Sequence, residues 1–457
     1  MRKRAEMGHT IHILYSRRLE YIMIYFRITF TLITVLYVVS LLLFLHFVIF
    51  GLVGLCRRRT FSKAQRKLRY GIIVSARNEE AVIGNLIRSI RSSDYPQDKL
   101  DIFVVAHNCT DRTAAAATAA GARVYVYDNP DECTKGYATR YLFRRIEEDY
   151  GTQAYDGFFT LDADNVLDRQ FITKMNDAFA ATDGRAVITS FRNSKNFGAN
   201  VISAMYGLYF IQGCRMESRG RTLLGCSTRV QGTGYLIPAA VVKDGWSYVT
   251  LTEDWELTAD VVLDGIPILY CDEAMTYDEQ PTSLRVMWRQ RLRWAKGHLL
   301  VGLSRFRDVL SRLFTPASSP SAHGKFSVFD LGMNIYPSLL VFLGIGLLQH
   351  ALLWLSPLFG YSVGEAYARV FPSMLYGGVF YYVMTVLLSA LLYVVERRRI
   401  PHVRPTVKLL SILLMPVFLT VSFGAAVAAL FTKNVSWKPI PHQDTTTIEA
   451  LGDQKKP

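Results

Sequence analysis

Residues 157–166 have the sequence GFFTLDADNV, in which a short apolar run ends in two aspartates one residue apart. The run 157–162 has the length and composition of a buried strand. Side chains at i and i+2 of an extended segment point the same way, so we expect Asp162 and Asp164 to face one ligand. A surface turn is the alternative explanation for so short a pattern.

Two close carboxylates without a cation would force one of them to stay protonated. A divalent metal removes that conflict. Hard oxygen ligands suit Mg²⁺ or Mn²⁺, which commonly keep water and take the rest of their shell from substrate phosphates. We therefore predict that Asp162 and Asp164 hold a metal that in turn holds a phosphate group.

Between residues 70 and 300, short apolar runs alternate with helical stretches, which predicts a parallel sheet covered by helices. The predicted strands are 70–76, 101–106, 122–127 and 157–162. Ligands of open α/β sheets bind beyond the carboxyl ends of the strands. The polar side chains expected there are Ser75, Arg77, Asn78, Glu79, His107, Asn108, Thr110 and Asp111. For 108–111, a turn followed by a helix cap is the alternative.

The composition indicates a membrane protein rather than an ordinary soluble one. Half of the 457 residues are hydrophobic, and the net charge is +14. A hydrocarbon core ~30 Å thick needs about 20 apolar residues per helix. The runs that meet this length are 21–56, 331–355, 370–395 and 407–432, which predicts four spans.

Basic flanks predict the orientation of these spans. Residues 57–69 carry seven positive charges and no acid, which is typical of a cytoplasmic flank. Contact of this stretch with anionic lipid head groups explains it better than nucleic-acid binding. The six cysteines form no CxxC pair, which suits reduced thiols in the cytosol. We expect a multi-pass protein of the cell membrane with a cytosolic central domain.

The predicted organisation has five parts. They are a basic or interfacial segment 1–27, an anchor 28–56, a cytosolic α/β domain 57–312 with an amphipathic interface helix near 283–300, a membrane region 326–432 of about three helices, and a polar tail 433–457.

Two further motifs lie in the second half of the α/β domain. LTEDWELTAD (251–260) puts Glu253 and Asp254 at a predicted helix start, where acids favour the helix dipole and stability alone could explain them. In RVMWRQRLRWAKGH (285–298), helical spacing places Gln290, Arg293 and Trp294 on one face. A basic amphipathic helix on the membrane surface is a compatible explanation of this second motif.

Taken together, these segments resemble the membrane-integrated family 2 glycosyltransferases, such as the synthases of cellulose, chitin, hyaluronan and poly-N-acetylglucosamine. The resemblance runs from about Tyr70 to Leu300 and into the flanking apolar helices. Its signatures stand in the family order: SARNEE and NCTD after two strands, DAD at 162–164, TED at 252–254 and QRLRW at 290–294. It implies a Rossmann-like GT-A fold, a nucleotide-diphosphate sugar donor, a divalent metal and inverting transfer.

The resemblance also implies roles for individual residues. The implied donor site is Ser75, Arg77, Glu79, Asn108, Asp111, Lys135, Asp162 and Arg293. The implied acceptor site is Gln290 and Trp294, with Thr233 and Gly234 of GTGYLIP (232–238). The implied metal ligands are Asp164 and Asp162, and the implied catalytic residues are Asp254, as general base, and Glu253. His107 departs from the family, many members of which have an acid at that position.

Three hypotheses for the function remain open at this stage. The first is a processive synthase that extends a β-linked glycan from UDP-glucose or UDP-N-acetylglucosamine. Four spans are few for a pore, so coupled export would require an oligomer or a partner protein. The second is a non-processive enzyme that glycosylates a lipid. The third is a receptor or structural protein with a degenerate transferase domain, against which the intact acids at 162, 164 and 254 argue.

Overall fold

The computed structural model describes residues 2–315, 324–335, 338–433, 435 and 439–454. The chain divides into two compact units. The helical unit comprises residues 1–46 and 338–385, and the sheet unit comprises residues 47–337 and 386–457. All of the predicted site residues lie in the sheet unit.

The helical unit draws on α1 (Arg2–Cys56), α11 (Ser338–Trp354) and α12 (Val363–Val395). Aromatic side chains join these segments: the rings of Tyr25 and Phe359 stack with centroids 4.1 Å apart, and Phe26 meets Tyr361 edge to face. Helix α1 is continuous from Arg2 to Cys56, so a division between an interfacial segment and an anchor at residue 27 stays a prediction.

Among the residues that the structure describes, three helical segments are long and apolar enough to cross a membrane, by length and composition. They are Glu20–Cys56, Val363–Val395 and Pro405–Phe431, the last being α13. A fourth span results if α10 (Gly324–Ile335) and residues 340–354 are counted as one bent span. These helices agree with membrane association, while the number of spans and their orientation stay predictions.

The sheet unit is built on an eight-stranded sheet in the order β3-β2-β1-β4-β7-β6-β8-β5. The four predicted strands are confirmed as β1 (Tyr70–Ala76), β2 (Leu100–His107), β3 (Arg123–Tyr127) and β4 (Gly157–Asp162). They are mutually parallel, with β1 between β2 and β4. The others are β5 (Val166–Leu167), β6 (Val187–Ser194), β7 (Tyr235–Pro238) and β8 (Ile268–Asp278).

The expectation of an all-parallel sheet is wrong, because the sheet is mixed. Strand β7 runs antiparallel to both β4 and β6, and β5 runs antiparallel to β8. The chain enters β7 through a turn in which Gly232 and Gly234 have φ of +80° and +69°, a backbone conformation that favours glycine. A four-residue strand after such a turn has no periodicity that would distinguish it from a loop.

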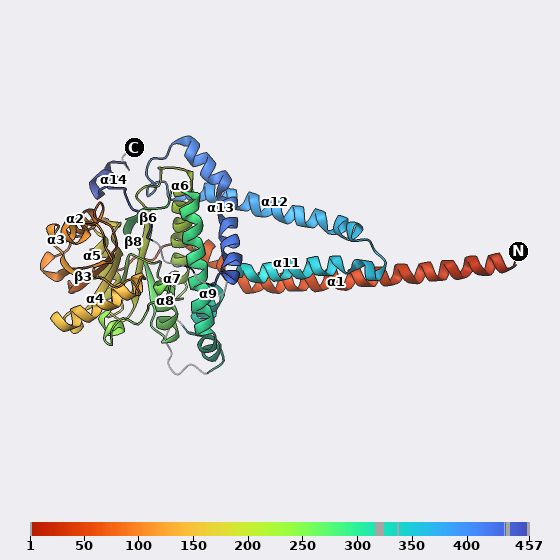
Figure 1. Cartoon of the computed structure of the whole chain (residues 1–457), viewed down its shortest axis with the longest axis horizontal. Coiled ribbons are helices and arrows are strands. Elements are labelled where there is room, and N and C mark those ends of the chain that lie inside the picture. The colour runs from red at the N-terminus through yellow and green to blue at the C-terminus, as the bar shows by residue number, and fades with distance from the viewer. Residues whose placement is uncertain (1, 316–323, 336–337, 434, 436–438, 455–457) are drawn as a thin grey trace. The chain divides into compact units, whose positions relative to one another are not determined.

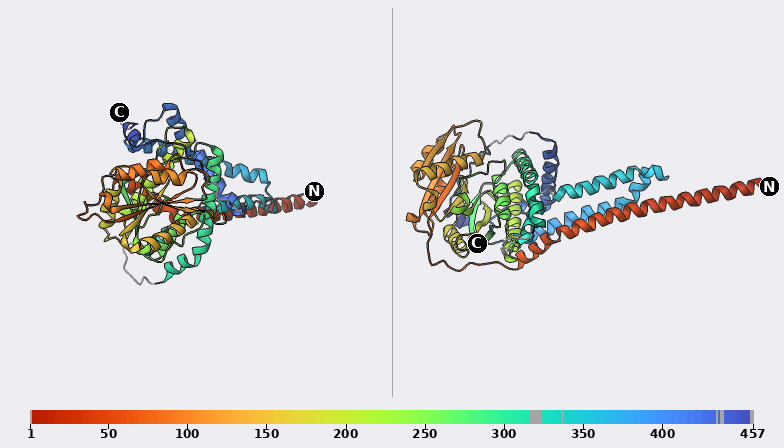
Figure 2. Two further views of the ribbon diagram at one scale, coloured as in Figure 1. Left: turned by 60° about the vertical axis from the view of Figure 1, so that its left-hand side comes forward. Right: turned by 90° about the horizontal axis from the view of Figure 1, so that it is seen from below.

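Helices cover both faces of this sheet (Figure 2). Alternate residues of β1 point to opposite faces, with Ile72 and Val74 on one side and Ile73 on the other. The helices packed on the side of Ile72 are α2 (Ile83–Arg91), α3 (Thr113–Ala119) and α5 (Phe171–Ala180). Those on the side of Ile73 are α4 (Lys135–Asp149) and α8 (Glu253–Leu263).

A second layer of helices joins the sheet to α13. It consists of α6 (Val201–Gln212), the π-helical η3 (Gly213–Ser218), α7 (Arg219–Leu223) and α9 (Leu284–Phe314). Helix α9 extends well beyond the helix predicted near 283–300 and runs beside α13 (Figure 1). The Arg291 guanidinium of α9 lies over the Phe418 ring of α13 at 4.1 Å. The predicted interface helix is therefore packed directly against an apolar helix.

A buried ion network ties β8 to the segments around it. Asp272 accepts hydrogen bonds from Arg219 at 2.5 Å and from Arg399 at 2.8 Å, and Glu396 accepts one from Arg215 at 2.6 Å. Burial alone would raise the pKa of Asp272, but Arg399 and Arg219 lower it to about 2. The carboxylate therefore stays ionised and holds the buried guanidinium of Arg219 and the partly buried one of Arg399.

We predict that Asp272→Ala lowers the free energy of unfolding by about 3–5 kcal/mol, because it leaves the buried Arg219 and the partly buried Arg399 without this acceptor. Thermal unfolding of the detergent-solubilised protein measures the loss. The matched control is Glu273→Ala, since the neighbouring Glu273 is partly exposed and pairs with Lys174 at 3.4 Å, an arrangement worth about 0–1 kcal/mol. Equal losses in the two variants would contradict a structural role for the network.

Candidate active site

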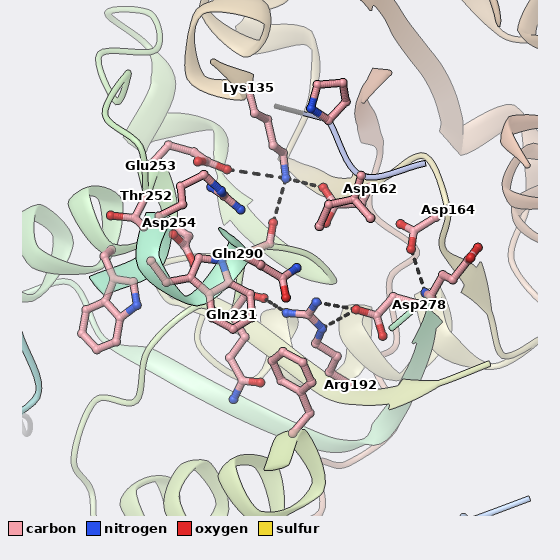
Figure 3. Close-up of a pocket in the computed structure, with 18 of the residues that line it drawn as sticks. Lys135, Asp162, Asp164, Arg192, Gln231, Thr252, Glu253, Asp254, Asp278 and Gln290 are labelled. Carbon is pink, nitrogen blue, oxygen red and sulfur yellow. Dashed lines mark hydrogen bonds and ion pairs between the residues drawn. The ribbon is translucent and has the colours of Figure 1, made fainter. Parts of the chain in front are cut away.

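A cavity of about 530 Å³ opens at the carboxyl ends of β1 and β4 (Figure 3). Most of the predicted site residues line it, although they come from segments far apart in the sequence. They are Ser75, Arg77, Glu79, His107, Lys135, Asp162, Asp164, Glu253, Asp254, Gln290, Arg293 and Trp294. The structure therefore brings the SARNEE, DAD, TED and QRLRW segments to one place.

Asn108 and Asp111 lie outside this lining and bind local backbone instead. Asn108 exchanges hydrogen bonds with the backbone of Asn129, at 2.8 Å as donor and 2.7 Å as acceptor. The Asp111 carboxylate accepts from the backbone N–H of Thr113 at 3.0 Å and of Glu80 at 3.1 Å. These contacts are those of a turn, and donor contact by either residue stays a prediction.

Thr233 and Gly234 also lie outside the lining, underneath the aspartates. The Thr233 hydroxyl accepts from the backbone N–H of Asp162 at 2.9 Å and donates to the side chain of Asn165. Gly234 has no room for a side chain, since a Cβ would lie 2.6 Å from the Ser190 hydroxyl. The structure gives both residues a supporting position, and the acceptor contacts predicted for them stay a prediction. Gln231 and Gly232, which the sequence did not single out, line the cavity instead.

Lys135 stands between the two acidic motifs (Figure 3). As the first residue of α4, it donates to Asp162 at 2.5 Å and to the Gly232 carbonyl at 2.8 Å, and its Nζ is 3.6 Å from a Glu253 oxygen. Burial would lower the pKa of Lys135, but Asp162 and Glu253 outweigh burial and raise it above its usual value. The ammonium group is therefore fully charged near neutral pH.

The two aspartates of the DAD motif line the cavity from the end of β4 and from the turn that follows it. Strand β4 ends at Asp162, and Asp164 lies in the following turn, so the two-residue periodicity of a strand does not orient their side chains. Asp162 faces Lys135, whereas Asp164 accepts from the backbone N–H of Glu279 at 2.7 Å. The predicted extended geometry is wrong, but both carboxylates still line the same cavity.

An ion pair that the sequence analysis missed completes this wall of the cavity. Arg192 of β6 donates to Asp278, the last residue of β8, at 2.6 Å and to the Gln231 carbonyl at 2.7 Å. Its guanidinium lies 3.8 Å from the centre of the Phe210 ring. Burial raises the pKa of Asp278 to about 6, although Arg192 opposes that shift. Neither strand was predicted, so no sequence signal marked the pair.

The carboxylates suit a divalent metal that a substrate helps to hold. Among the residues that the structure describes, no group of three or more His, Cys, Asp or Glu side chains is placed to hold a metal alone. Glu79 has a buried carboxylate oxygen with no hydrogen-bond partner, and it lines the cavity with Asp162 and Asp164. These hard oxygen donors fit Mg²⁺ or Mn²⁺ whose remaining ligands are water and phosphate oxygens.

Glu253 and Asp254 open α8 on the other side of Lys135. Burial, followed by the charge of Glu253, raises the pKa of Asp254 to about 7, while Lys135 opposes the shift. Thr252 stands at the N-cap position, but its side chain makes no capping hydrogen bond. It packs against α9 at Gly297, where a Cβ would lie 2.4 Å from the Thr252 side chain. The position of α8 therefore depends on the absence of a side chain at 297.

The QRLRW segment of α9 presents Gln290, Arg293 and Trp294 to the cavity, and Leu292 also lines it. Arg293 donates to the Leu251 carbonyl at 2.8 Å, just before the TED motif. The Trp294 ring meets Phe210 edge to face, and Gln290 has a buried oxygen with no hydrogen-bond partner. The helical spacing predicted for these side chains is confirmed, and Gln290 has an acceptor available for a ligand.

Comparison with known families agrees with this arrangement. The model of glycosyltransferase-like family 2 matches residues 68–297, half of the chain. The chain belongs to this family. The region matched contains all four motifs that line the cavity.

This family 2 glycosyltransferase is similar to several curated proteins. It is 26% identical over 288 residues to the probable glycosyltransferase YdaM of Bacillus subtilis, covering 61% of this chain and 64% of the relative. It is 23% identical over 325 residues to the β-monoglucosyldiacylglycerol synthase of Nostoc, covering 66% of this chain and 64% of that one. It is 24% identical over 269 residues to the poly-β-1,6-N-acetyl-D-glucosamine synthase of Staphylococcus epidermidis, covering 56% of this chain and 58% of that one. The chain thus spans less than two thirds of each of these relatives.

A solved structure shows the same fold. The mannosyltransferase PcManGT from Pyrobaculum calidifontis, in complex with GDP-Man and Mn²⁺, superposes with a TM-score of 0.57 at 14% identity. The match covers 88% of this chain and 99% of that one. The predicted GT-A fold, a Rossmann-like mixed α/β sheet accompanied by apolar helices, is confirmed.

We predict that Gly297→Ala lowers transferase activity about 10²-fold, because the new Cβ pushes Thr252, and with it the start of α8, out of position. Turnover of the purified enzyme measures the effect, and thermal unfolding reports whether the fold is retained. The control is Gly324→Ala, where an added Cβ meets nothing within 4 Å. Full activity of Gly297→Ala would show that α8 tolerates the displacement.

Proposed function

We propose that this protein is an inverting hexosyltransferase that uses a UDP-sugar and extends a β-linked glycan at the cytosolic surface of the cell membrane. The observation that carries the proposal is that Asp162, Asp164, Asp254 and Arg293 line one cavity. The residue roles below follow from that geometry and from the family resemblance.

The donor binds at the end of the cavity near Ser75, Glu79 and the two aspartates. Asp164 and Asp162 hold Mg²⁺ or Mn²⁺ there, which, when bound, supplies positive charge to the diphosphate. Lys135 and Arg293 carry the protein's own positive charge to the same region. The departing nucleoside diphosphate gains negative charge during transfer, so these fixed cations stabilise it where that charge develops.

Asp254 acts as the general base. A sugar hydroxyl is a poor nucleophile near neutral pH, and a carboxylate within about 2.6–3.2 Å must accept its proton as the bond to the sugar forms. The pKa of Asp254, about 7, lies where a base is both ionised and strong enough to accept a proton. Glu253 raises that pKa and shares the charge of Lys135.

The acceptor binds on the α9 side of the cavity. Trp294 offers an aromatic surface suited to the apolar face of a pyranose ring, and Gln290 offers a free acceptor for its hydroxyls. A glycan acceptor fits this combination of aromatic and planar polar side chains.

A lipid acceptor is the second candidate, and two observations favour it. Leu419 of α13 lines the cavity, so an apolar helix borders the acceptor side. Further along α9, Leu303 is 66% and Phe314 82% exposed, which suits contact with the membrane surface. The name of the Nostoc relative, a glucosyldiacylglycerol synthase, also supports a lipid acceptor.

Reconstitution separates these two candidates. We expect the purified protein in vesicles to release UDP from UDP-glucose or UDP-N-acetylglucosamine in the presence of Mn²⁺. We expect this release of UDP to stop when a chelator is added. Mass spectrometry of the product distinguishes a long polymer from a singly glycosylated lipid. Activity that persists in chelator would contradict the metal assignment, and absence of UDP release from any donor would contradict the proposed use of a UDP-sugar.

We predict that Asp254→Asn lowers the rate of transfer about 10²–10⁴-fold while leaving binding of UDP with Mn²⁺ intact, because the amide cannot accept the proton. In the wild type, kcat/KM should fall as the pH drops below about 7, since Asp254 then becomes protonated. Turnover measured from pH 5 to 9 and titration with UDP test both expectations.

The control for this prediction is Glu256→Gln in the same first turn of α8. This substitution removes the same charge from the start of the helix. In the wild type, the Glu256 carboxylate accepts from the backbone N–H of Thr250 at 3.2 Å. If Glu256→Gln lowers the rate as much as Asp254→Asn, the acids act through helix stability and Asp254 is not the base.

A further inference from the structure

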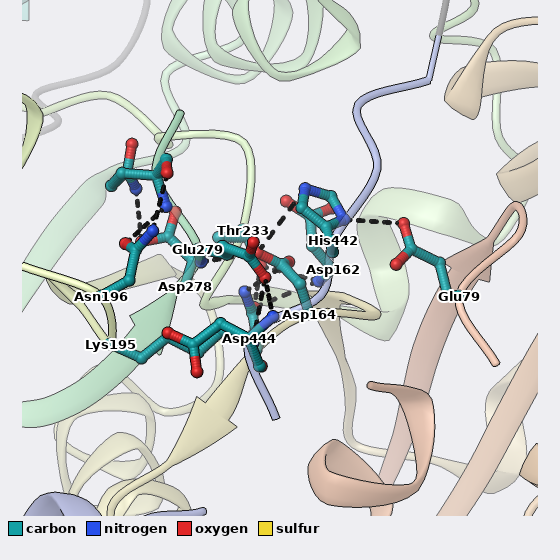
Figure 4. Close-up of polar contacts among 12 residues, drawn as sticks. Glu79, Asp162, Asp164, Lys195, Asn196, Thr233, Asp278, Glu279, His442 and Asp444 are labelled. Atoms are coloured by element: carbon teal, nitrogen blue, oxygen red, sulfur yellow. Dashed lines mark hydrogen bonds and ion pairs between the residues drawn. The ribbon is translucent and has the colours of Figure 1, made fainter. Parts of the chain in front are cut away.

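One ion pair on the cavity wall has no part in the mechanism proposed above. Arg192 belongs to β6 and Asp278 ends β8, and both side chains line the cavity. Their exposed fractions are only 13% and 3%. Figure 4 shows the end of β8, at Asp278 and Glu279, beside Asp164, which the backbone N–H of Glu279 binds. A buried ion pair often stabilises a fold no better than apolar side chains of similar volume, so stability alone gives little reason for this pair on a cavity wall.

The Arg192 guanidinium is fixed in place and still has hydrogen-bond donors to offer. Its Nε donates to Asp278 at 2.6 Å, its Nη1 donates to the Gln231 carbonyl at 2.7 Å, and it lies 3.8 Å from the centre of the Phe210 ring. Asp278 is held in turn by the side chain of Gln280, which donates to it at 2.6 Å. A guanidinium carries five N–H donors, and these contacts use only part of that set.

Arg192 lies between the metal side and the base side of the cavity. Towards the base, only Gly232 stands between them: a Cβ there would lie 3.7 Å from an Asp254 oxygen and 3.9 Å from Nη1 of Arg192. Towards the metal, burial would lower the pKa of Arg192, but Asp278 and then the two DAD aspartates raise it above its usual value. In an inverting transfer the attacking hydroxyl and the leaving group are on opposite faces of the sugar. The transferred sugar must therefore lie between the DAD motif and Asp254, next to Arg192.

The chemistry of the pair suits the hydroxyl groups of a sugar. Each hydroxyl can accept from an N–H of Arg192 and donate to a carboxylate oxygen of Asp278, because an ionised carboxylate has about four lone-pair sites. The pair is neutral as a whole, and other carboxylates, Asp254 among them, line the same space. Like charges at such a distance disfavour each other, so a sugar that carries its own acid would bind poorly. The site therefore fits an uncharged hexose or N-acetylhexosamine better than a uronic acid.

We propose that Arg192 and Asp278 bind the hydroxyl groups of the donor's sugar and thereby restrict the donor to an uncharged hexose or N-acetylhexosamine. This inference rests on the proposed function, because it takes the donor to be a UDP-sugar whose diphosphate lies at the DAD motif. A site built to hydrogen-bond a hydroxyl discriminates strongly, since a sugar without that hydroxyl leaves the buried polar groups unpaired. The pair is thus the part of the cavity that reads the sugar rather than the nucleotide.

The test compares the affinity of the full-length protein for UDP with its affinity for a UDP-sugar, by calorimetry with Mn²⁺ and without an acceptor. Arg192→Lys keeps the charge opposite Asp278 but loses the planar set of donors. We expect this variant to bind UDP-glucose or UDP-N-acetylglucosamine, whichever the wild type prefers, about tenfold more weakly, and to bind UDP within about twofold of the wild type. We also expect the wild type to bind UDP-glucuronate at least about tenfold more weakly than its preferred UDP-sugar.

Arg221→Lys is the matched control. Arg221 and Asp330 form another buried ion pair, at 2.7 Å, and neither residue lines the cavity. The control makes the same chemical change in a similar environment, so it shows what loss of stability alone does to binding. It should leave the ratio of the two affinities at the wild-type value. Asp278→Asn is a second variant at the site, and it should weaken the UDP-sugar in the same direction as Arg192→Lys while UDP binding is retained.

The two affinities separate the possible outcomes. Equal weakening of UDP and the UDP-sugar in Arg192→Lys would overturn the assignment, because it would place the guanidinium on the diphosphate. An unchanged affinity for the UDP-sugar would overturn it as well, and so would wild-type protein that binds UDP-glucuronate as tightly as the neutral donor. If Arg192→Lys does not fold, as thermal unfolding would show, Asp278→Asn decides by the same ratio. Failure of the wild type to bind UDP would instead contradict the proposed function.

Discussion

The interaction on which the site depends is the ammonium group of Lys135 placed between Asp162 and Glu253. These acids belong to two motifs almost a hundred residues apart, and without a shared cation their charges would repel each other in a partly buried cavity. The same amine also donates to the Gly232 carbonyl. One residue at the start of α4 therefore contacts the DAD motif, the TED motif and the turn before β7.

Close packing carries this arrangement out to the apolar helices. Gly297 allows α9 to touch Thr252 at the start of α8, and Arg293 of the same helix holds the Leu251 carbonyl. On its far side, α9 packs against α13 through Arg291 and Phe418. A helix long and apolar enough to cross a membrane is thus only one helix away from the candidate base.

Two acids at the donor end of the cavity, Glu79 and Asp278, have raised pKa values. Glu79 is buried, and burial raises its pKa to about 7, while the hydrogen bond from His442 opposes the shift. Burial likewise raises the pKa of Asp278, and its partner Arg192 opposes that shift. Asp278 therefore has Arg192 as its basic partner, and Glu79 has His442.

The sequence by itself determined the first four strands, the helix start at TED and the helix face of QRLRW, because these depend on patterns within short segments. It did not determine that β7 is antiparallel, that Asp164 lies in a turn, or that Asp278, Arg192 and His442 reach the cavity. Those features depend on contacts such as Glu279 with Asp164, 115 residues apart, and Glu79 with His442, 363 apart. Only the path of the folded chain brings such residues together, since no local pattern encodes which distant strand or tail will be the neighbour.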